Sequence, residues 1–473
     1  MDLKIGVLQM NILLITVDCL RADHLSCMGY HRQTSPFIDS LAEKGMLFTQ
    51  AIINGVGTFS SFPALMTSTY PFMYGGYERI NRKTIAEILQ KRGYVTAAFN
   101  DNSFLSPYFG YDRGFNHFDC MGIRRGETFV KKLARKLYEA VSVSKSLSEF
   151  AWKMHHYLFL WKRPKMGGAS INKRVFSWLE ENYADNFFLW IHYMDAHGNH
   201  YAPQEYFRKI GLQPPSQKEL INLNRKLGRS ASRLYKEGKI SEREIELLRA
   251  TYDAEVRYVD DCIKEMLNKL ASLGIEKNTA TIITADHGEG FFEHGDYHSA
   301  ENFYDEMLRV PLIIYSPDIA PKGIDEQVES MDIAPTILDL IGEKGEDAFV
   351  GKSLLHDNAG GKYVISEAAH DYLKTSGTQK IVKIDFNLRK TSIRFEKGNS
   401  KWKYISSTKE NKEELYDLKC DPFEKNNLIG RKDGKIEVIL GEFRERLQAH
   451  FKLEKEQRRV KQKIKRLRTG YHF

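Results

Sequence analysis

The chain of 473 residues is predicted to form an α/β fold with a mostly parallel sheet, helices on both faces and a small C-terminal antiparallel subdomain. Short apolar runs alternate with helix-like runs through the first 370 residues, which predicts the parallel sheet and its helices. Near the C-terminus the runs shorten and alternate by twos around turn residues, which predicts the antiparallel subdomain. An apolar content of 42% suffices for a large core, and the chain is longer than one compact domain usually is.

Each element follows from its local pattern. Strands are expected where short apolar or β-branched runs lie between turn signals, at 11–18, 46–52, 94–99, 187–194, 279–285 and 310–315. Helices are expected where apolar residues recur every three or four positions, at 36–44, 84–92 and 241–273. The antiparallel runs between 380 and 418 are separated by turns at Asn387, Gly398 and Asn411. The chain is thus divided into an α/β domain (1–370), an antiparallel subdomain (371–430) and a basic helical tail (431–473).

Two of the apolar runs end on residues that bind metals. The run 12–17 is followed by Asp18, and the run 281–285 is followed by Asp286 and His287. Ligand crevices of open α/β sheets form at the carboxyl ends of parallel strands, so both acids are expected in one crevice. One such aspartate alone would indicate a helix cap or a turn, but two of them with an adjacent imidazole predict a metal site.

A third segment supplies hydroxyl groups. Gly57 is followed by Thr58, Ser60 and Ser61, and then by a stretch that can start a helix with Pro63 near its first turn. A hydroxyl at a helix N-terminus lies over unsatisfied backbone N–H groups and the positive end of the helix dipole, which favours a tetrahedral oxyanion. Taken alone, the segment would indicate an ordinary helix cap.

Six motifs of the chain match one known family. They are VDCLRADHLSCMGY (17–30), TFSSFPALMTSTYP (58–71), HYMDAHGNHY (192–201), ADHGEGFFEHGDYHSAENFYDEMLRVPLII (285–314), DIAPTILDLIG (332–342) and ELYDLKCDPFEKNNL (414–428). In this order they resemble the first metal motif, nucleophile segment, substrate-histidine segment, second metal motif and C-terminal landmarks of the sulfatase family in the alkaline phosphatase superfamily. The resemblance implies an alkaline-phosphatase-like fold and a metal-dependent ester hydrolase.

The resemblance places Thr58 at the nucleophile position, counted back from Thr67. The best-known sulfatases carry there a Cys or Ser in C/S-x-P-x-R that matures to formylglycine. Ser60 and Phe62 stand where that motif has proline and arginine. Threonine cannot become formylglycine, because its β-carbon carries a methyl group, so the resemblance implies a free hydroxyl nucleophile.

An alternative register places Ser61 at the nucleophile position, since Ser61-Phe62-Pro63 satisfies S-x-P. Leu65 then occupies the arginine position, and the distance to Thr67 is three residues too short. Thr58 is therefore preferred.

The resemblance implies that Asp18, Asp286, His287 and the Thr58 hydroxyl surround one divalent cation. Cys19 stands where calcium-binding members have a second aspartate. Three oxygens and one nitrogen suit zinc or manganese at least as well as calcium. Coordination to the cation would stabilise the threonine alkoxide and aim it at a sulfur or phosphorus centre.

Substrate-side roles are expected for five further residues, with His197 and His298 as general acids and Asn102, His200 and His294 as substrate contacts. A surface or hydrogen-bonded histidine is the alternative for His197 and His298, and the absence of a direct role is the alternative for His200 and His294. His192, inside the apolar run 187–194, is expected to be a core histidine and not a ligand.

The way in which the ester on Thr58 is cleaved distinguishes a sulfatase, a phosphoesterase and a phosphotransferase. A formylglycine hydrate can expel sulfate through its second hydroxyl, whereas a threonine ester must be attacked at its central atom, which phosphorus accepts readily. The sequence therefore predicts a sulfatase-like hydrolase of sulfate or phosphate esters on a small molecule, glycan or lipid. A phosphotransferase acting on a glycan or lipid, and a non-catalytic binder of anionic ligands, are the alternatives.

The positive charge is concentrated at the C-terminus. Residues 452–468 carry nine Lys or Arg and two Glu, a net +7 of the chain's +8, so the enzyme body is nearly neutral and no nucleic-acid partner is indicated. The tail is expected to be a solvated helix, and 121–170 a basic, aromatic helical insertion. Contact of either segment with an anionic membrane is the alternative.

The N-terminus and the cysteines indicate the compartment. Residues 1–20 lack a signal-peptide pattern, and the five cysteines lack Cys-x-x-Cys spacing. Both observations predict a cytoplasmic protein.

Overall fold

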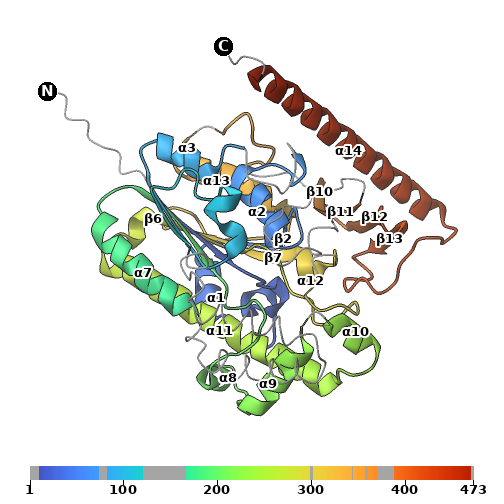
Figure 1. Cartoon of the computed structure of the whole chain (residues 1–473), viewed down its shortest axis with the longest axis horizontal. Coiled ribbons are helices and arrows are strands. Elements are labelled where there is room, and N and C mark those ends of the chain that lie inside the picture. Colours follow the sequence, from blue (N-terminus) through green and yellow to red (C-terminus); the bar gives the residue numbers. More distant parts are fainter. Residues whose placement is uncertain are drawn as a thin grey trace, which may run out of the picture.

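The structure is a computed structural model that describes residues 10–73, 82–120, 167–228, 230–298, 302–343, 345–356, 361–369 and 388–469. These residues form a large α/β unit, a four-stranded antiparallel sheet and a long C-terminal helix (Figure 1). The fold class predicted from the sequence is confirmed.

The large sheet has nine strands within the described residues. They are β1 (Asn11–Val17), β2 (Met46–Ile52), β3 (Val95–Asn100), β4 (His117–Cys120), β5 (Phe187–Tyr193), β6 (Thr279–Ala285), β7 (Arg309–Tyr315), β8 (Lys322–Ile324) and β9 (Val328–Glu329). Their order is β4-β3-β5-β1-β6-β7-β2-β8, with β9 paired to β2. The sheet is parallel except where β7 runs against β6 and β2.

The central strands β5, β1 and β6 are apolar along most of their length because they are covered on both faces. Every residue of all three strands is buried. A strand that is covered on both faces has no solvent-facing side, so its sequence is rich in apolar and β-branched residues and does not alternate with charged ones. For this reason the sequence predicted the bounds of these three strands to within one residue.

Within the described residues there are eleven α-helices, some of which pack on the two sides of the large sheet. They are α1 (Pro36–Ala42), α2 (Thr58–Thr67), α3 (Ile85–Lys91), α7 (Gly167–Asn182), α8 (Gln204–Lys209), α9 (Gln217–Lys226), α10 (Ala231–Lys236), α11 (Glu242–Ser272), α12 (Asp305–Leu308), α13 (Ile333–Leu340) and α14 (Gly434–Thr469). Helices α2, α3 and α13 lie on one side of the sheet, and α1, α7 and α11 lie on the other (Figure 1). Pro63 lies in the second turn of α2, not near its first turn as expected.

The C-terminal sheet consists of β10 (Lys362–Ala369), β11 (Arg389–Lys397), β12 (Ser400–Ser407) and β13 (Lys412–Asp417), all antiparallel and in that order. Its first strand precedes the boundary predicted at 370/371. Val364 of β10 packs into the main core, whereas Ile365 packs into the C-terminal core. Because β10 lies between two cores, it lacks the alternation that marks the other three strands.

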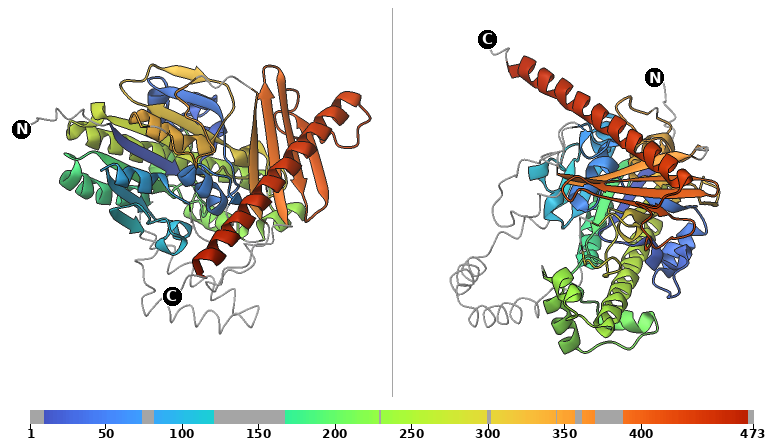
Figure 2. Two further views of the ribbon diagram at one scale, coloured as in Figure 1. Left: turned by 90° about the horizontal axis from the view of Figure 1, so that it is seen from above. Right: turned by 90° about the vertical axis from the view of Figure 1, so that its right-hand side faces the viewer.

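Helix α14 crosses the C-terminal sheet (Figure 2). Ile436, Phe443 and Leu447 of the helix share an apolar cluster with Trp402 and Tyr404 of β12. The first half of this helix, which precedes the basic residues 452–468 for which a solvated helix was expected, is therefore packed on the sheet. The apolar stripe of Ile436, Phe443 and Leu447 was not predicted from the sequence, because only the charge of residues 452–468 was considered.

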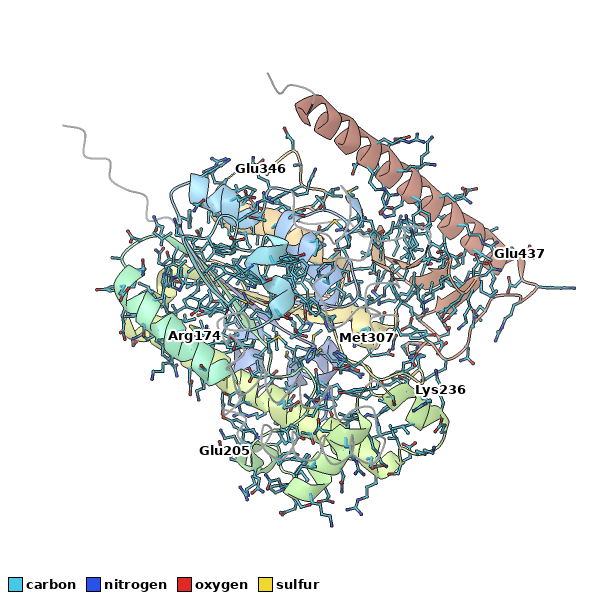
Figure 3. The ribbon with its side chains drawn as sticks, viewed as in Figure 1. Arg174, Glu205, Lys236, Met307, Glu346 and Glu437 are labelled. Carbon is cyan, nitrogen blue, oxygen red and sulfur yellow. The ribbon has the colours of Figure 1, made fainter. Side chains whose placement is uncertain are left out.

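Helix α12 connects the two sheets. Met307 of α12 is buried in the main core near the centre of the molecule (Figure 3). Its neighbour Asp305 accepts a hydrogen bond from the buried Lys403 of β12 over 2.8 Å. A buried ion pair with good geometry fixes the relative position of the two sheets.

None of the helices within the described residues is both long enough and apolar enough to span a membrane. The predicted insertion 121–170 lies outside the described residues up to 166, and its last four residues belong to α7.

Candidate metal and active site

Asp18 and Asp286 lie side by side because β1 and β6 are adjacent parallel strands. Val17 pairs with Ala285 in the sheet register, so the next residue of each strand reaches the same edge. Both carboxylates are completely buried. The backbone N–H of Cys19 donates a hydrogen bond to Asp286 Oδ1 over 3.3 Å, which ties the two strand ends together.

The next strands of the sheet, β5 and β3, bring two more polar side chains to this point. His192 of β5 lies with Nε2 3.3 Å from Asp18 Oδ2, and its Nδ1 lies 2.9 Å from the Thr16 hydroxyl. Asn102, which follows β3, donates from Nδ2 to Asp18 Oδ2 over 3.0 Å. His192 is buried with both ring nitrogens partnered, as expected of a core histidine, and its Nε2 also faces the carboxylate of Asp18. The pairing of β5 with β1 decides where this imidazole points, and the apolar run does not reveal it.

Thr58 is the first residue of α2 and meets this cluster. The helix is preceded by Gly57 at φ 84°, a left-handed conformation that glycine tolerates. The Thr58 hydroxyl donates to Asp18 Oδ2 over 3.4 Å and accepts from Asn102 Nδ2 over 3.4 Å. The Ser61 hydroxyl instead donates to the Thr58 carbonyl within the helix. The helix start therefore brings Thr58, and not Ser61, to the carboxylates.

His287 lies close to both carboxylates. Its Nε2 lies 3.5 Å from Asp18 Oδ1 and 3.6 Å from Asp286 Oδ2, while its Nδ1 lies 2.7 Å from the Gly288 carbonyl. Within the described residues, Asp286 Oδ2 is buried without a hydrogen-bond partner. A buried carboxylate oxygen of this kind is costly unless a cation meets it. Ligand atoms of Asp18, His192 and Asp286 lie within 4.8 Å of one another, so the chain's own donors converge on one point.

The electrostatics of the two carboxylates differ. Burial opposes ionisation of Asp18, but His197, His192 and His287 outweigh it and hold the pKa of Asp18 well below its usual range. Burial and the charge of Asp18 raise the pKa of Asp286. The crevice therefore gathers negative charge that the imidazoles only partly neutralise, which is the environment a divalent cation requires.

His298 and His197 lie beside this cluster, as predicted from their positions in the motifs. Their ring centroids are 4.6 Å apart, and His298 lies 6.5 Å from the ring of His287. Burial opposes the charged form of His298, but Glu289, 2.7 Å from its Nδ1, raises its pKa to about 9. The pKa of Glu289 is correspondingly lowered to about 2, against the effect of burial. Burial lowers the pKa of His197, so the two imidazoles differ in charge near neutral pH.

His200 is buried, and both its ring nitrogens have partners. Its Nδ1 lies 2.6 Å from Glu255 Oε2, and its Nε2 lies 3.1 Å from the Tyr297 hydroxyl. These contacts hold the His200 ring inside the protein, between α11 and the loop that carries Tyr297.

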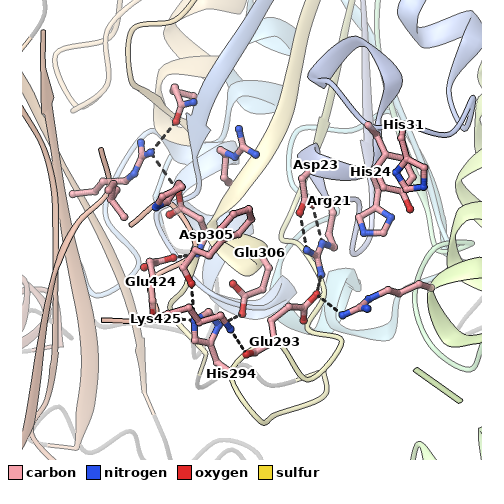
Figure 4. A pocket seen from close by; sticks show the side chains of 18 of the residues that line it. Arg21, Asp23, His24, His31, Glu293, His294, Asp305, Glu306, Glu424 and Lys425 are labelled. Carbon is pink, nitrogen blue, oxygen red and sulfur yellow. Dashed lines mark hydrogen bonds and ion pairs between the residues drawn. The ribbon is translucent and has the colours of Figure 1, made fainter. Parts of the chain in front are cut away.

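His294 holds the metal-motif loop against the C-terminal subdomain. Its Nδ1 lies 2.7 Å from Glu306 Oε1, and its Nε2 lies near the carbonyls of Phe423 and Glu424 (Figure 4). The residue lines a cavity of about 660 Å³ next to these contacts. The structure thus places His294 with the C-terminal contacts and not with the cluster around Thr58.

Two site residues were not recognised from the sequence. Glu289 directly follows the Asp286-His287-Gly288 motif, so its position was visible, but its contact with His298 depends on how the loop folds back. Cys19 was interpreted only as a missing aspartate, although its Sγ lies 3.2 Å from Asp18 Oδ1.

Comparison with known proteins shows the family to which the chain belongs. Residues 10–343 match the family described as Sulfatase, and residues 292–452 match the N-sulphoglucosamine sulphohydrolase C-terminal family. The chain belongs to the sulfatase family. It is 22% identical to an arylsulfatase of Clostridium perfringens, over 90% of this chain and 92% of the relative. It is 32% identical to a delta 4,5-hexuronate-2-O-sulfatase of Bacteroides thetaiotaomicron, but that match covers only 41% of this chain and 39% of the relative.

Solved structures share the fold over almost the whole chain. The phosphonate monoester hydrolase of Agrobacterium radiobacter superposes with a TM-score of 0.68 at 17% identity, over 94% of this chain and 96% of the other. A phosphonate monoester hydrolase from Silicibacter pomeroyi gives a TM-score of 0.67 at 20% identity, over 93% and 95% of the two chains. At these identities the likeness shows the alkaline-phosphatase-like fold alone.

Proposed function

We propose that the protein is a metal-dependent hydrolase of sulfate or phosphate esters with Thr58 as its nucleophile. The observation that carries this proposal is the position of the Thr58 hydroxyl, 3.4 Å from Asp18 Oδ2 at the start of α2. Membership of the sulfatase family supports the class of reaction. A divalent cation, when bound, supplies the positive charge that lowers the pKa of the hydroxyl and neutralises the ester. Asp18, Asp286 and His287 would hold it, with zinc, manganese and calcium as candidates.

The reaction proceeds by two displacements. The Thr58 hydroxyl releases its proton to solvent and its oxygen attacks the sulfur or phosphorus atom. The bond from that atom to the leaving oxygen breaks, and the group is held on Thr58 as an ester, whose cleavage returns a solvent proton to the threonine oxygen. The backbone N–H groups at the start of α2 face the charge on the equatorial oxygens. Asn102 orients the nucleophile through its hydrogen bond to the Thr58 oxygen.

His298 and His197 transfer the protons of the two steps. Because Glu289 raises the pKa of His298 to about 9, this imidazole carries a proton at neutral pH and donates it to the departing alkoxide. His197, with its lowered pKa, is neutral and accepts the proton of the water that attacks the Thr58 ester. The products are the alcohol, free sulfate or phosphate, and the restored threonine hydroxyl.

The threonine favours phosphoesters over sulfate esters. A phosphate ester on Thr58 accepts attack at phosphorus, whereas the sulfate ester lacks the second hydroxyl through which a formylglycine hydrate expels sulfate. If an alcohol of a glycan or lipid replaces water in the second step, the same site acts as a phosphotransferase. If the site holds an anionic ligand but does not cleave it, the protein is a non-catalytic binding protein for anionic ligands.

The substrate is proposed to be a small molecule, glycan or lipid that carries the ester. The relatives named for hexuronate and aryl sulfates support an anionic ester of modest size. The net charge of +7 in residues 452–468 supports a peripheral contact with anionic lipid, and cytoplasmic residence remains a prediction.

The deciding experiment compares nitrophenyl sulfate, phosphate, phosphodiester and phosphonate esters with the metal-loaded protein. Thr58→Ala should lower turnover by about a thousandfold or more, since a nucleophile is lost. Ser61→Ala is the matched control and should retain activity, because its hydroxyl faces the helix backbone. Release from the sulfate ester alone would contradict the threonine argument. Release from none of the esters would favour the transferase or the binder.

A further inference from the structure

A cavity of about 660 Å³ lies between the loop after β6, helix α11 and the C-terminal subdomain (Figure 4). Its lining comes from segments far apart in the sequence, which include β2, α11, α12, β7 and the strands β11 and β12. A cavity of this size can enclose a small organic ligand. Among the described residues, none of the side chains that cluster around Thr58 lines it. The cavity is therefore distinct from the proposed active site.

The carboxylates of the cavity already have basic partners. Six acidic residues line it, and each lies 3.3 Å or less from an arginine, a lysine or a histidine. The pairs are Asp23 and Glu293 with Arg21, Glu246 with Arg32, Asp305 and Glu424 with Lys403, and Glu306 with His294. Carboxylates that are paired in this way leave little negative charge for the other cations of the lining.

Three cations of the lining have no carboxylate of their own. Within the described residues, Arg309 at the start of β7 forms no ion pair and donates one hydrogen bond, to a backbone carbonyl at 3.4 Å. Arg249 of α11 lies 3.8 Å from the Glu293 carboxylate, which Arg21 already holds at 2.7 Å. Lys425 donates to the Glu293 carbonyl and, in the part of the chain that the structure describes, to no carboxylate. The cavity therefore has a surplus of positive charge.

The three cations gather around one chain of ion pairs. Two of them, from α11 and from the C-terminal subdomain, approach Glu293. Burial opposes ionisation of Asp23, but Arg21 and, from beyond contact distance, Arg309 lower the pKa of its carboxyl. Arg21 in turn contacts both Asp23 and Glu293. A single ligand that fills the cavity can therefore meet all three cations.

We infer that the cavity binds a tetrahedral oxyanion, phosphate or sulfate, either free or as the charged group of a small organic molecule. Guanidinium groups bind such anions through paired N–H donors, and a lysine adds a point charge. The cations come from β7, α11 and the C-terminal subdomain, so they approach the ligand from different sides, which suits a tetrahedral ion. The ring of Phe423, which is 75% exposed, also lines the cavity and offers an apolar surface to an organic group.

Glu289 joins the wall of this cavity to the catalytic crevice. Its carbonyl accepts a hydrogen bond from Arg21 over 2.9 Å, and its carboxylate lies 2.7 Å from His298 Nδ1. The cavity is therefore next to the loop that holds His298, but an anion bound there needs none of the residues of the proposed reaction. The inference goes beyond the proposed function and does not depend on it.

The test is isothermal titration of the full chain with inorganic phosphate, inorganic sulfate and phenyl phosphate, with metal bound and after its removal by a chelator. Chelation leaves the crevice around Asp18 and Asp286 without a cation, so its negative charge repels an anion. We expect about one ion to bind per chelated chain, with a Kd on the order of 1 mM or lower, which corresponds to about three hydrogen bonds to charged groups.

Variants locate the bound ion. Arg309→Gln and Lys425→Gln alter different segments, and each should raise the Kd about tenfold or more, because a hydrogen bond to a charged group is lost. Arg243→Gln is the matched control and should leave the Kd unchanged, since this arginine of α11 is exposed and does not line the cavity. Phenyl phosphate that binds more tightly than phosphate supports an organic ligand, and equal Kd values support the free ion.

Each other outcome decides the inference. It is overturned if the chelated protein binds none of the three ions, because an ion that requires the metal lies in the crevice. An unchanged Kd in both Arg309→Gln and Lys425→Gln, or an equal loss in Arg243→Gln, also overturns it. If Arg309→Gln does not fold by circular dichroism, Lys425→Gln decides. If the chelated protein does not fold, the metal-loaded protein decides, because each variant must then weaken one of its binding events. No readout requires hydrolysis, so failure of the proposed function leaves this test intact.

Discussion

At the scale of single residues, Asn102 links the proposed nucleophile Thr58 to the carboxylate of Asp18. Its Nδ2 donates to both Asp18 Oδ2 and Thr58 Oγ1. Its own position is fixed, because Oδ1 accepts the Phe104 N–H over 2.9 Å and its backbone N–H donates to Asn100 Oδ1. An amide held in this way orients the threonine hydroxyl without carrying charge.

Asn102→Ala is expected to lower kcat/KM about 10- to 100-fold, the usual cost of losing a residue that orients a metal ligand. The side chain is buried and caps the 3-10 turn Ser103–Leu105, so the melting temperature should fall by the small amount that the loss of a cap costs. Ester hydrolysis by the purified variant measures the first effect, and a thermal melt measures the second. An unchanged kcat/KM would show that the hydrogen bonds to Thr58 and Asp18 are dispensable.

At the scale of elements, the metal-motif loop is packed directly against α12. The Gly288 N–H donates to the Met307 carbonyl over 2.9 Å. A Cβ on Gly288 would lie 1.9 Å from the Glu306 carbonyl oxygen, a distance no atoms tolerate. The loop after β6 can therefore hold His287 in place only with glycine at the next position.

Gly288→Ala should displace this loop and weaken metal binding. The overpacking is expected to cost about 1–3 kcal/mol of unfolding free energy, because the clash is with backbone and not with a mobile side chain. Gly323→Ala is the control, since a Cβ at Gly323 meets nothing within 4 Å. Zinc titration and thermal melts of both variants measure the effects. Equal metal affinity in the two variants would contradict the expectation.

Helix α14 is docked on β10 by buried charges. His450 of α14 lies with Nε2 3.2 Å from Glu367 Oε2 and 3.3 Å from Glu454 Oε1. Burial opposes the imidazolium, but the two carboxylates raise the pKa of His450 to about 9. Burial and Glu454 raise the pKa of Glu367 to about 7. Both shifts favour the protonated forms in the folded protein.

The stability that His450 contributes should therefore depend on pH. A raised folded-state pKa adds stability that is complete below the unfolded value of 6.5 and is lost as the pH rises to about 9. His450→Ala should lower the unfolding free energy by on the order of 3 kcal/mol in the acidic part of this range, and by clearly less above it. Urea unfolding at both ends of the range measures the difference. A difference that does not vary with pH would contradict this account.

At the scale of the whole molecule, the crevice couples metal binding to folding. Asp18 and Asp286 are completely buried beside each other, and four strands of the large sheet converge on them. Without a cation, like charges in this position oppose the folded state. Because Asp18 and Asp286 follow central strands of the large sheet, this repulsion between their charges lowers the stability of the entire α/β unit.

Removal of metal by a chelator is expected to lower the melting temperature, and the bound cation should restore it. A cation that binds only the folded chain stabilises it by about 2.7 kcal/mol at a free concentration of a hundred times its Kd. Melts with zinc, manganese and calcium at matched concentrations rank the three candidates. No change on chelation or on addition of any of the three would contradict the metal site.

Much of the fold was predictable because it depends on local patterns. The central strands, α11 and the turns at Gly398 and Asn411 follow from apolar runs, helical spacing and turn residues. Strand β10 was assigned to the wrong domain, because a strand shared by two cores carries no alternation. The apolar stripe of α14 was overlooked because the charge that follows it dominates the composition.

By itself the sequence determined which chemical groups the site contains, since Asp18, Thr58, Asp286 and His287 each stand at the end of a strand or the start of a helix. Only the tertiary structure decided which other groups join them. Strand pairing turned His192 inward, and loop packing took His294 to the C-terminal subdomain and set Glu289 behind an imidazole. The physical reason is that the position of a side chain along its own strand or helix is a local property. Its neighbours across a sheet or a loop depend on register and packing between distant segments.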